Sequence, residues 1–475
     1  MEKKSLKSFI SSRLGEIIAA AVLLLAMAWF AFWGFSARTL SVQGVITAAL
    51  ELGMLAVGVV IAVPRALNFF RGLPELSSVS RGERSLRPGR LPAEIGIVLM
   101  TMLLRALLIL AAYAVSTLTR GFHGTVFATL EDIWLKSDTE AQSILAIAEN
   151  GYSVTANTLT APLFPLMVRG VSYFLGSGFL SAMLINTVLT CAFSAVVYRL
   201  ALCDIGRRSS RTAVLFTLAM PAAIFFAAPT SDALFLLLTA SALLALRKEK
   251  FIIAGIFAAL ASFSRIWGII IIVPYLAEAA AFFVREQRDR GVNGLASRIV
   301  RVSLGFVLAL LGGFAYVLAD RLAYGQWFRF LGFAANVKAQ KPAPFMTAAV
   351  YQIDELFSTI GRNNSTALAL WVPNLLFVFG ALAVFVASAR TLHTSYSLYF
   401  AAYFISACGF EGLAAAPRYL TALAVLPLAL ALLCESRDDG EGIMRSRAKT
   451  AAVLAVLAVG QIFYLIMYVL KYKIY

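Results

Sequence analysis

The chain of 475 residues is 60% hydrophobic and only 14% charged, with a mean hydropathy of +0.83. A soluble protein of this size could not bury so much apolar surface, so the composition indicates an integral membrane protein. The formal net charge of +16 does not indicate a nucleic-acid-binding protein, because the basic residues collect in short loops between apolar segments.

Apolar segments recur along the chain and predict an all-α, polytopic membrane protein with about thirteen transmembrane helices, because a spanning helix needs roughly 20 apolar residues. The expected helices lie near residues 16–35, 43–63, 93–118, 179–201, 212–228, 230–247, 251–264, 266–284, 300–318, 367–389, 394–411, 418–434 and 450–470. The short segments on either side of Arg265 are candidates for half-helices that line a cavity.

The basic residues set the expected orientation of these helices. Most of the 41 Lys and Arg residues fall in loops on one side, which the positive-inside rule assigns to the cytoplasm. The loops 119–178 and 319–366 then face the periplasm, the cell exterior or the lumen of the endoplasmic reticulum. We therefore expect a multi-pass protein of the cell membrane whose outer loops carry the functional site.

Two regions are expected along the chain. Residues 1–92 form a hairpin of two helices and a basic cytoplasmic linker, and residues 93–475 form the larger transmembrane domain. Glu51 and Arg105 fall at similar depths in the second and third helices, where either charge alone would be costly in lipid. We expect an ion pair between them to fasten the hairpin to the rest of the protein.

The stretch 131–169 is a polar outer segment between two long hydrophobic blocks. Its acidic residues are Glu131, Asp132, Asp138, Glu140 and Glu149. A proline-stiffened apolar segment follows them and ends at Arg169. Residues 137–140 (SDTE) fit a capping box, in which the Glu140 carboxylate returns to the amide of Ser137. The acids therefore have a structural interpretation beside a functional one.

Four short motifs follow one another in the second region: 147–152 (IAENGY), 161–165 (APLFP), 228–235 (APTSDALF) and 416–420 (APRYL). In order and approximate spacing they resemble the motifs of the PIG-V-like mannosyltransferases, polytopic glycosyltransferases of the GT-C class. The region just before residues 147–152 departs from the family, because residues 142–144 (QSI) stand where the family usually has aromatic residues. A second departure is that no Trp stands directly before either candidate acid.

The resemblance implies a GT-C-like fold and an inverting glycosyltransferase without a cofactor. Such an enzyme moves a sugar, in that family mannose, from a polyprenyl- or dolichyl-phosphate donor to a lipid or glycan acceptor on the outer face. The candidate substrate-binding residues are Arg418, Tyr419, Arg265, Asp232, Arg169 and Glu149. Arginine suits the donor phosphate, because its planar fork binds two oxygens and stays charged. We expect Arg418 to bind the phosphate, with Arg265 as the second candidate.

The catalytic base is expected at Asp138 or Glu140. Counting back without gaps from residues 147–148 selects Glu140, whereas matching the preceding Trp134 and the Asp-Thr pair selects Asp138 with a two-residue insertion. The capping role available to Glu140 slightly favours Asp138. Either carboxylate would take the proton of the acceptor hydroxyl while phosphate leaves from the opposite face of the sugar.

A lipid or small-solute transporter is the alternative function, in which the same charges would line a translocation path. The sequence shows no obvious internal repeat of the kind that many transporters have. The four cysteines and two histidines lack metal-ligand spacing, so no metal site is expected. The expected partners are the lipid-linked donor, the acceptor and membrane lipids, without nucleic acid.

Overall fold

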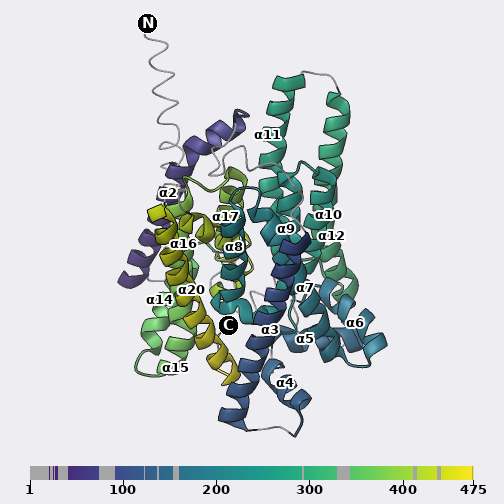
Figure 1. Cartoon of the computed structure of the whole chain (residues 1–475), viewed down its shortest axis with the longest axis vertical. Helices are drawn as coiled ribbons and strands as arrows, with labels where there is room; N and C mark the ends of the chain where they lie inside the picture. Colours follow the sequence, from purple (N-terminus) through teal and green to yellow (C-terminus); the bar gives the residue numbers. More distant parts are fainter. Residues whose placement is uncertain are drawn as a thin grey trace.

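The computed structural model describes residues 21, 25, 27–29, 41–73, 91–121, 124–135, 139–152, 160–290, 294–328, 343–409, 414–435, 440–472 and 474. Over these ranges every regular element is a helix and none is a strand. The all-α prediction is therefore confirmed. Figure 1 shows most of the long helices running along the length of the molecule.

Seven of the described helical segments are long and apolar enough to cross a membrane. They lie in or overlap with α2 (Val42–Phe70), α3 (Leu91–Arg120), α7 (Gly178–Ala201), α11 (Ile272–Arg290), α12 (Leu295–Tyr324), α16 (Val372–Ser388) and α20 (Gly440–Val469). Three shorter apolar helices accompany them: α6 (Leu163–Leu175), α10 (Phe251–Ser264) and α19 (Val425–Cys434). The protein is thus a multi-pass membrane protein. The number of thirteen spans stays a prediction, and most of its first helix, 16–35, lies outside the described residues.

The two predicted outer loops form short helices at one end of the molecule. α4 (Val126–Trp134), α5 (Glu140–Asn150) and α6 come from the first loop, and α14 (Thr347–Thr359) and α15 (Asn364–Thr366) come from the second. All five lie toward the lower end of Figure 1, whereas the tip of the α11–α12 hairpin lies at its upper end. We call these the outer and the inner end. Their assignment to the two sides of a membrane stays a prediction.

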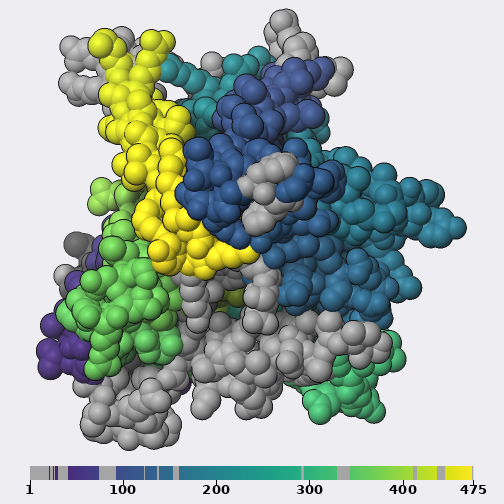
Figure 2. All heavy atoms as spheres, turned by 90° about the horizontal axis from the view of Figure 1, so that it is seen from below, coloured from purple at the N-terminus to yellow at the C-terminus, as the bar shows by residue number. Residues whose placement is uncertain are grey.

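The outer acid Asp132 connects α20 to α3 and α4 through two ion pairs. Figure 2 shows α20, in yellow, against the blue segment that contains α3 and α4. The Asp132 carboxylate lies 2.5 Å from Arg120 Nη2 and 2.5 Å from Lys471 Nζ, just beyond α20. Burial acts to raise the pKa of Asp132, but the hydrogen bond and charge of Lys471, with Arg120, lower it below its usual value. Asp132 therefore has a structural role.

Proline and arginine positions break the central helices into short pieces. α8 (Arg207–Ala219) gives way to the 3-10 helix η1 (Pro221–Phe226), because Pro221 has no N–H to continue the α-helix. The single helix predicted at 212–228 is therefore wrong. α10 ends at Arg265, whose extended backbone (φ −157°, ψ 136°) separates it from the 3-10 helix η2 (Ile266–Ile271). The predicted helix break at Arg265 is confirmed.

Close packing of α10 on α12 fixes the position of this break. A Cβ added to Gly255 would lie 2.0 Å from the carbonyl oxygen of Gly305, and one added to Gly312 would lie 2.1 Å from that of Ala259. Only glycine permits these approaches, and small residues serve this purpose between membrane helices. The end of α10, and with it Arg265, is therefore held by backbone contacts.

The predicted ion pair between Glu51 and Arg105 is wrong. Arg105 donates instead to the carbonyl groups of Phe226 and Ala227, beside α7 and η1. Glu51 is fully buried where α2 packs mainly against α14 and α16, and its carboxylate has no hydrogen-bond partner among the described residues. Similar depth in the membrane did not make the two side chains neighbours, because the face of the helix on which a side chain lies determines which neighbouring helix it contacts.

Candidate functional site

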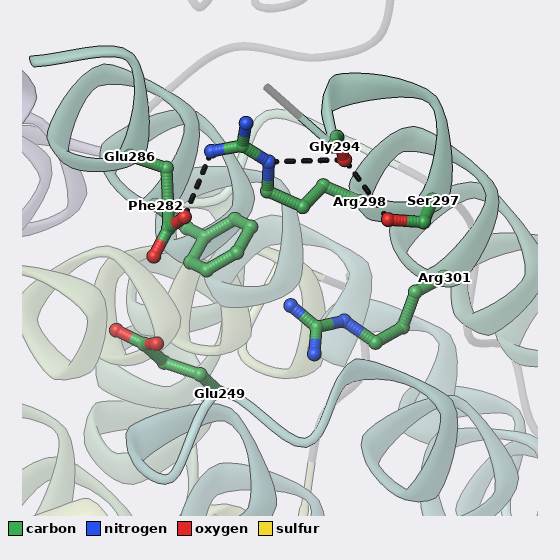
Figure 3. A pocket seen from close by; sticks show the side chains of 7 residues that line it. All are labelled: Glu249, Phe282, Glu286, Gly294, Ser297, Arg298 and Arg301. Atoms are coloured by element: carbon green, nitrogen blue, oxygen red, sulfur yellow. Dashed lines mark hydrogen bonds and ion pairs between the residues drawn. The ribbon is translucent and has the colours of Figure 1, made fainter. Parts of the chain in front are cut away.

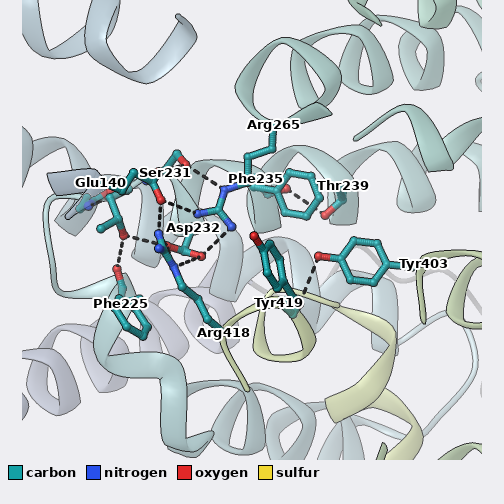
Figure 4. Close-up of polar contacts among 12 residues, drawn as sticks. Glu140, Phe225, Ser231, Asp232, Phe235, Thr239, Arg265, Tyr403, Arg418 and Tyr419 are labelled. Atoms are coloured by element: carbon teal, nitrogen blue, oxygen red, sulfur yellow. Dashed lines mark hydrogen bonds and ion pairs between the residues drawn. The ribbon is translucent and has the colours of Figure 1, made fainter. Parts of the chain in front are cut away.

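Four separate segments bring charged side chains together near the outer end. Glu140 opens α5, Asp232 opens α9 (Asp232–Arg247), Arg265 stands at the break after α10, and Arg418 lies in α18 (Ala416–Thr421). Figure 4 shows these side chains pointing toward one another, with Ser231 between them. We call Glu140, Ser231, Asp232, Arg265 and Arg418 the outer cluster.

Asp232 is the most buried member of the outer cluster, with its side chain 1% exposed. Its Oδ1 lies 2.9 Å from Arg265 Nη1, and its Oδ2 lies 2.5 Å from Arg418 Nη2. The hydroxyl of Thr230 donates a third bond to Oδ2, at 2.8 Å. Asp232 also lies in the first turn of α9, where the helix dipole favours a negative charge. These interactions hold both arginines in place.

Glu140 is the more accessible acid of the cluster, with its side chain 21% exposed. Its Oε1 accepts hydrogen bonds from the Ser231 amide (3.2 Å) and hydroxyl (2.5 Å). Its Oε2 lies 3.1 Å from Arg265 Nη2 and also accepts from Arg418. Burial acts to raise the pKa of the Glu140 carboxyl, but Arg418 and Arg265, together with Ser231, lower it well below its usual value.

The predicted capping role of Glu140 is wrong. α5 begins at Glu140 itself with Thr139 as its N-cap, and the Glu140 carboxylate is occupied by Ser231 and the two arginines. The capping argument, which slightly favoured Asp138 over Glu140, therefore fails, and the match to Trp134 and the Asp-Thr pair stays as the argument for Asp138. Asp138 and Ser137 lie outside the described residues.

Arg418 is fixed on two sides. Its guanidinium donates to Asp232 from both Nε (3.0 Å) and Nη2 (2.5 Å). Its Cζ lies 4.7 Å from the ring centroid of Phe225, a cation–π contact in a side chain that is only 10% exposed. The plane of the Arg418 guanidinium group is therefore fixed, and its Nη2 atom reaches the more exposed Glu140.

A layer of polar residues positions the turn that carries Ser231 and Asp232. Arg105 of α3 donates to the carbonyl groups of Phe226 and Ala227. Asn186 of α7 donates to those of Ala228 (2.5 Å) and Thr230 (3.1 Å). The turn 226–230 is thus held by side chains from two membrane helices. Sequence analysis did not assign this role to either residue, although a buried polar side chain in an apolar helix is a signal for it.

Aromatic residues lie beside the outer cluster. Tyr419 follows Arg418 and is half-buried, and its ring packs edge-to-face against Trp267, with centroids 6.5 Å apart. The Tyr403 hydroxyl of α17 (Thr394–Ala407) donates to the Tyr419 carbonyl at 3.2 Å. Trp267 was not a candidate from the sequence, where it is one of six tryptophans without a distinguishing motif.

The structure does not bring all candidates together. Arg169, in α6, and Glu149, at the end of α5, are exposed, and neither makes a described contact with the outer cluster. Glu149 lies instead near Gly178 at the start of α7. Within the described part of the chain, no group of three His, Cys, Asp or Glu side chains is placed to hold a metal ion.

Neither a known family model nor a curated protein matches the sequence. Among solved structures, the archaeal oligosaccharyltransferase AglB of Archaeoglobus fulgidus is similar, with 12–14% identity and TM-scores of 0.40–0.42. The similarity covers 76–78% of this chain and 55–56% of that protein, so the chain spans about half of its length. Those structures show the apo form, a form tethered to an acceptor peptide, and a complex with an inhibitory peptide and a dolichol-phosphate. A similarity this distant says nothing about the chemistry of the outer cluster.

Proposed function

We propose that the protein is a membrane glycosyltransferase that takes a sugar from a polyprenyl- or dolichyl-phosphate donor and transfers it, with inversion, to a lipid or glycan acceptor. The observation that carries this proposal is the convergence of two arginines and two carboxylates in the outer cluster. Two of its segments, 228–235 and 416–420, are motifs that resemble the PIG-V-like mannosyltransferases. That resemblance favours mannose as the sugar.

Arg418 and Arg265 are the proposed ligands of the donor phosphate. In the structure each contacts Asp232, which is buried, and Glu140, which is more exposed. An incoming phosphate would compete with Glu140 for the accessible edge of the two guanidinium groups, while Asp232 keeps them in place. The phosphate and the Glu140 carboxylate both offer oxygen atoms to the same guanidinium groups, and arginine binds a phosphate or a carboxylate bidentately.

Glu140 is the proposed general base. In the absence of substrate its pKa is held low, which makes the carboxylate a weak proton acceptor. Once a phosphate shares the charge of Arg418 and Arg265, the pKa of Glu140 rises and the carboxylate is free to take the acceptor proton. A bond then forms from the acceptor oxygen to the anomeric carbon as the bond to the phosphate oxygen breaks, and polyprenyl phosphate leaves with the electron pair. Asp138 stays the other candidate.

Tyr419 and Trp267 are proposed to border the sugar, because they lie next to the arginines and present aromatic surface there. Asp232 is proposed as a positioning residue, since its buried carboxylate orients both guanidinium groups. Glu149 keeps only the support of the motif 147–152, and Arg169 only that of its place at the end of the outer stretch 131–169.

The test is transfer by the purified protein in liposomes. Labelled polyprenyl-phosphate mannose, and in parallel arms other polyprenyl-phosphate sugars, are supplied with a lipid extract of the host membrane. We expect release of polyprenyl phosphate and a labelled acceptor, and a loss of about 10²–10⁴-fold in Glu140→Gln. Glu131→Gln is the matched control, because this neighbouring acid of α4 makes no described ion pair. Movement of intact donor across the liposome without any product would instead support the transporter alternative.

A further inference from the structure

A second polar site lies at the inner end, away from the outer cluster. A cavity of about 440 Å³ opens between the inner ends of α11 and α12 and the turn after α9. Figure 3 shows its lining residues: Glu249, Phe282, Glu286, Gly294, Ser297, Arg298 and Arg301. Its volume falls in the range of small-molecule sites. Glu249 follows the inner end of α9, whose outer end carries Asp232, so the proposed sugar transfer does not involve this cavity.

The four charged residues of the cavity differ in how they are paired. Arg298 Nη1 lies 2.8 Å from Glu286 Oε2, and its Nε donates to the Gly294 carbonyl at 3.3 Å, so these two charges are matched within the wall. Arg301 has no carboxylate within ion-pair distance among the described residues. Its guanidinium lies over the Phe282 ring, with Cζ 5.4 Å from the centroid, which fixes its direction.

Glu249 lies across the cavity from Arg301 (Figure 3). Its Oε1 is 3.4 Å from Arg285 Nη2, but the two side chains are 44% and 40% exposed, and a solvated pair of this kind contributes little. The cavity therefore presents one cation and one anion that face each other, and its charges sum to zero. A purely anionic ligand on Arg301 would also meet Glu249.

We propose that this cavity binds the zwitterionic headgroup of a phosphatidylethanolamine-type lipid, with its phosphate on Arg301 and its ammonium group on Glu249. The guanidinium fork suits phosphate oxygens, and a primary ammonium group can donate to a carboxylate. A lipid is favoured over a soluble phosphate because apolar surface adjoins the site. Val300 and Leu304, which flank Arg301 on α12, are 64% and 46% exposed and offer contact to acyl chains.

The test is native mass spectrometry of the detergent-purified protein with added phosphatidylethanolamine, phosphatidylglycerol or phosphatidylcholine, and with free phosphoethanolamine as the soluble arm. The wild type should retain one phosphatidylethanolamine with at least tenfold preference over the other lipids and over free phosphoethanolamine. Arg301→Gln should weaken that binding at least tenfold. Glu249→Gln should lose the preference and bind phosphatidylglycerol as tightly, because the facing negative charge is gone. Arg288→Gln, an exposed α11 residue outside the cavity, is the control.

Three results would overturn the proposal. Equal retention in the wild type and Arg301→Gln would show that the lipid binds elsewhere. An equal loss in Arg288→Gln would show a general attraction of headgroups to the basic inner end. Free phosphoethanolamine binding as tightly as the lipid would make the ligand a soluble phosphate ester. None of these readouts depends on sugar transfer, so the proposed function can fail or stand separately.

Discussion

Arg418→Lys keeps the positive charge of the proposed phosphate ligand but removes the planar shape of the guanidinium group. The guanidinium contacts Asp232 through two nitrogen atoms, reaches Glu140 and stacks on Phe225. A lysine ammonium keeps the charge but cannot span both carboxylates in one plane. At least one charge-assisted hydrogen bond, about 1.5–3 kcal/mol, is therefore lost, together with roughly 0.5–2 kcal/mol of stacking. We expect the free energy of unfolding to fall by about 2–5 kcal/mol.

The same substitution should weaken binding of the donor phosphate. Losing one of two hydrogen bonds to a phosphate corresponds to about a 10–100-fold increase in Kd. The assay is titration of the purified protein with a short-chain polyprenyl phosphate, with the melting temperature measured in parallel to show that the variant is folded. Arg362→Lys, an exposed residue of the outer end, is the control. An unchanged Kd in folded Arg418→Lys would refute the assignment of Arg418 to the phosphate.

Four further substitutions test the proposed roles of other residues. Glu140→Gln should lower sugar transfer by about 10²–10⁴-fold while Asp138→Asn keeps most of it, measured as initial rates of polyprenyl phosphate release; the opposite pattern would select the alignment with the two-residue insertion. Folding lowers the pKa of Glu140 below its usual value of 4.5. The ion pairs of its carboxylate therefore stabilise the folded protein fully above about pH 4.5, and this stabilisation is lost as the pH falls further. The difference in melting temperature between wild type and Glu140→Gln should therefore narrow below about pH 4.5, and a widening would contradict the ion pairs. Arg105→Met should lower the free energy of unfolding by about 2–4 kcal/mol and weaken phosphate binding, because it leaves buried carbonyl groups unpaired; phosphate affinity equal to that of the wild type would remove its positioning role. Asp132→Asn should cost only about 1 kcal/mol in denaturant unfolding and leave phosphate affinity unchanged, since its ion pairs are partly exposed; a large loss of affinity would mean that Asp132 belongs to the site.

The sequence was sufficient for the all-α, multi-pass architecture and for four of the five residues of the outer cluster. Long apolar segments need no tertiary information to be recognised as helices, which is why α3, α7 and α12 lie where hydropathy predicts them. Arg418, Arg265 and Asp232 stood out because a charge at the end of an apolar helix is rarely without a role. The structure brings all three together with Glu140.

The sequence could not predict which side chains on different helices contact each other. Glu51 and Arg105 have the right depth and opposite charge, yet the direction of each side chain depends on helix rotation, which hydropathy does not determine. The capping box at 137–140 fits a local pattern, but the Glu140 carboxylate is occupied by arginines more than a hundred residues away. Ser231 and Trp267 carry no signal by themselves, because Ser231 meets Glu140, and Trp267 meets Tyr419, only in the folded protein.

The central claim is that the outer cluster receives the phosphate of a lipid-linked sugar. The most direct measurement is an electron cryomicroscopy structure of the protein with a short-chain polyprenyl phosphate. We expect phosphate density within hydrogen-bond distance of Arg418 and Arg265, with Glu140 displaced from both guanidinium groups and Asp232 still bound to them. Phosphate density elsewhere, with the four charged side chains of the outer cluster still paired as they are without ligand, would contradict this proposal.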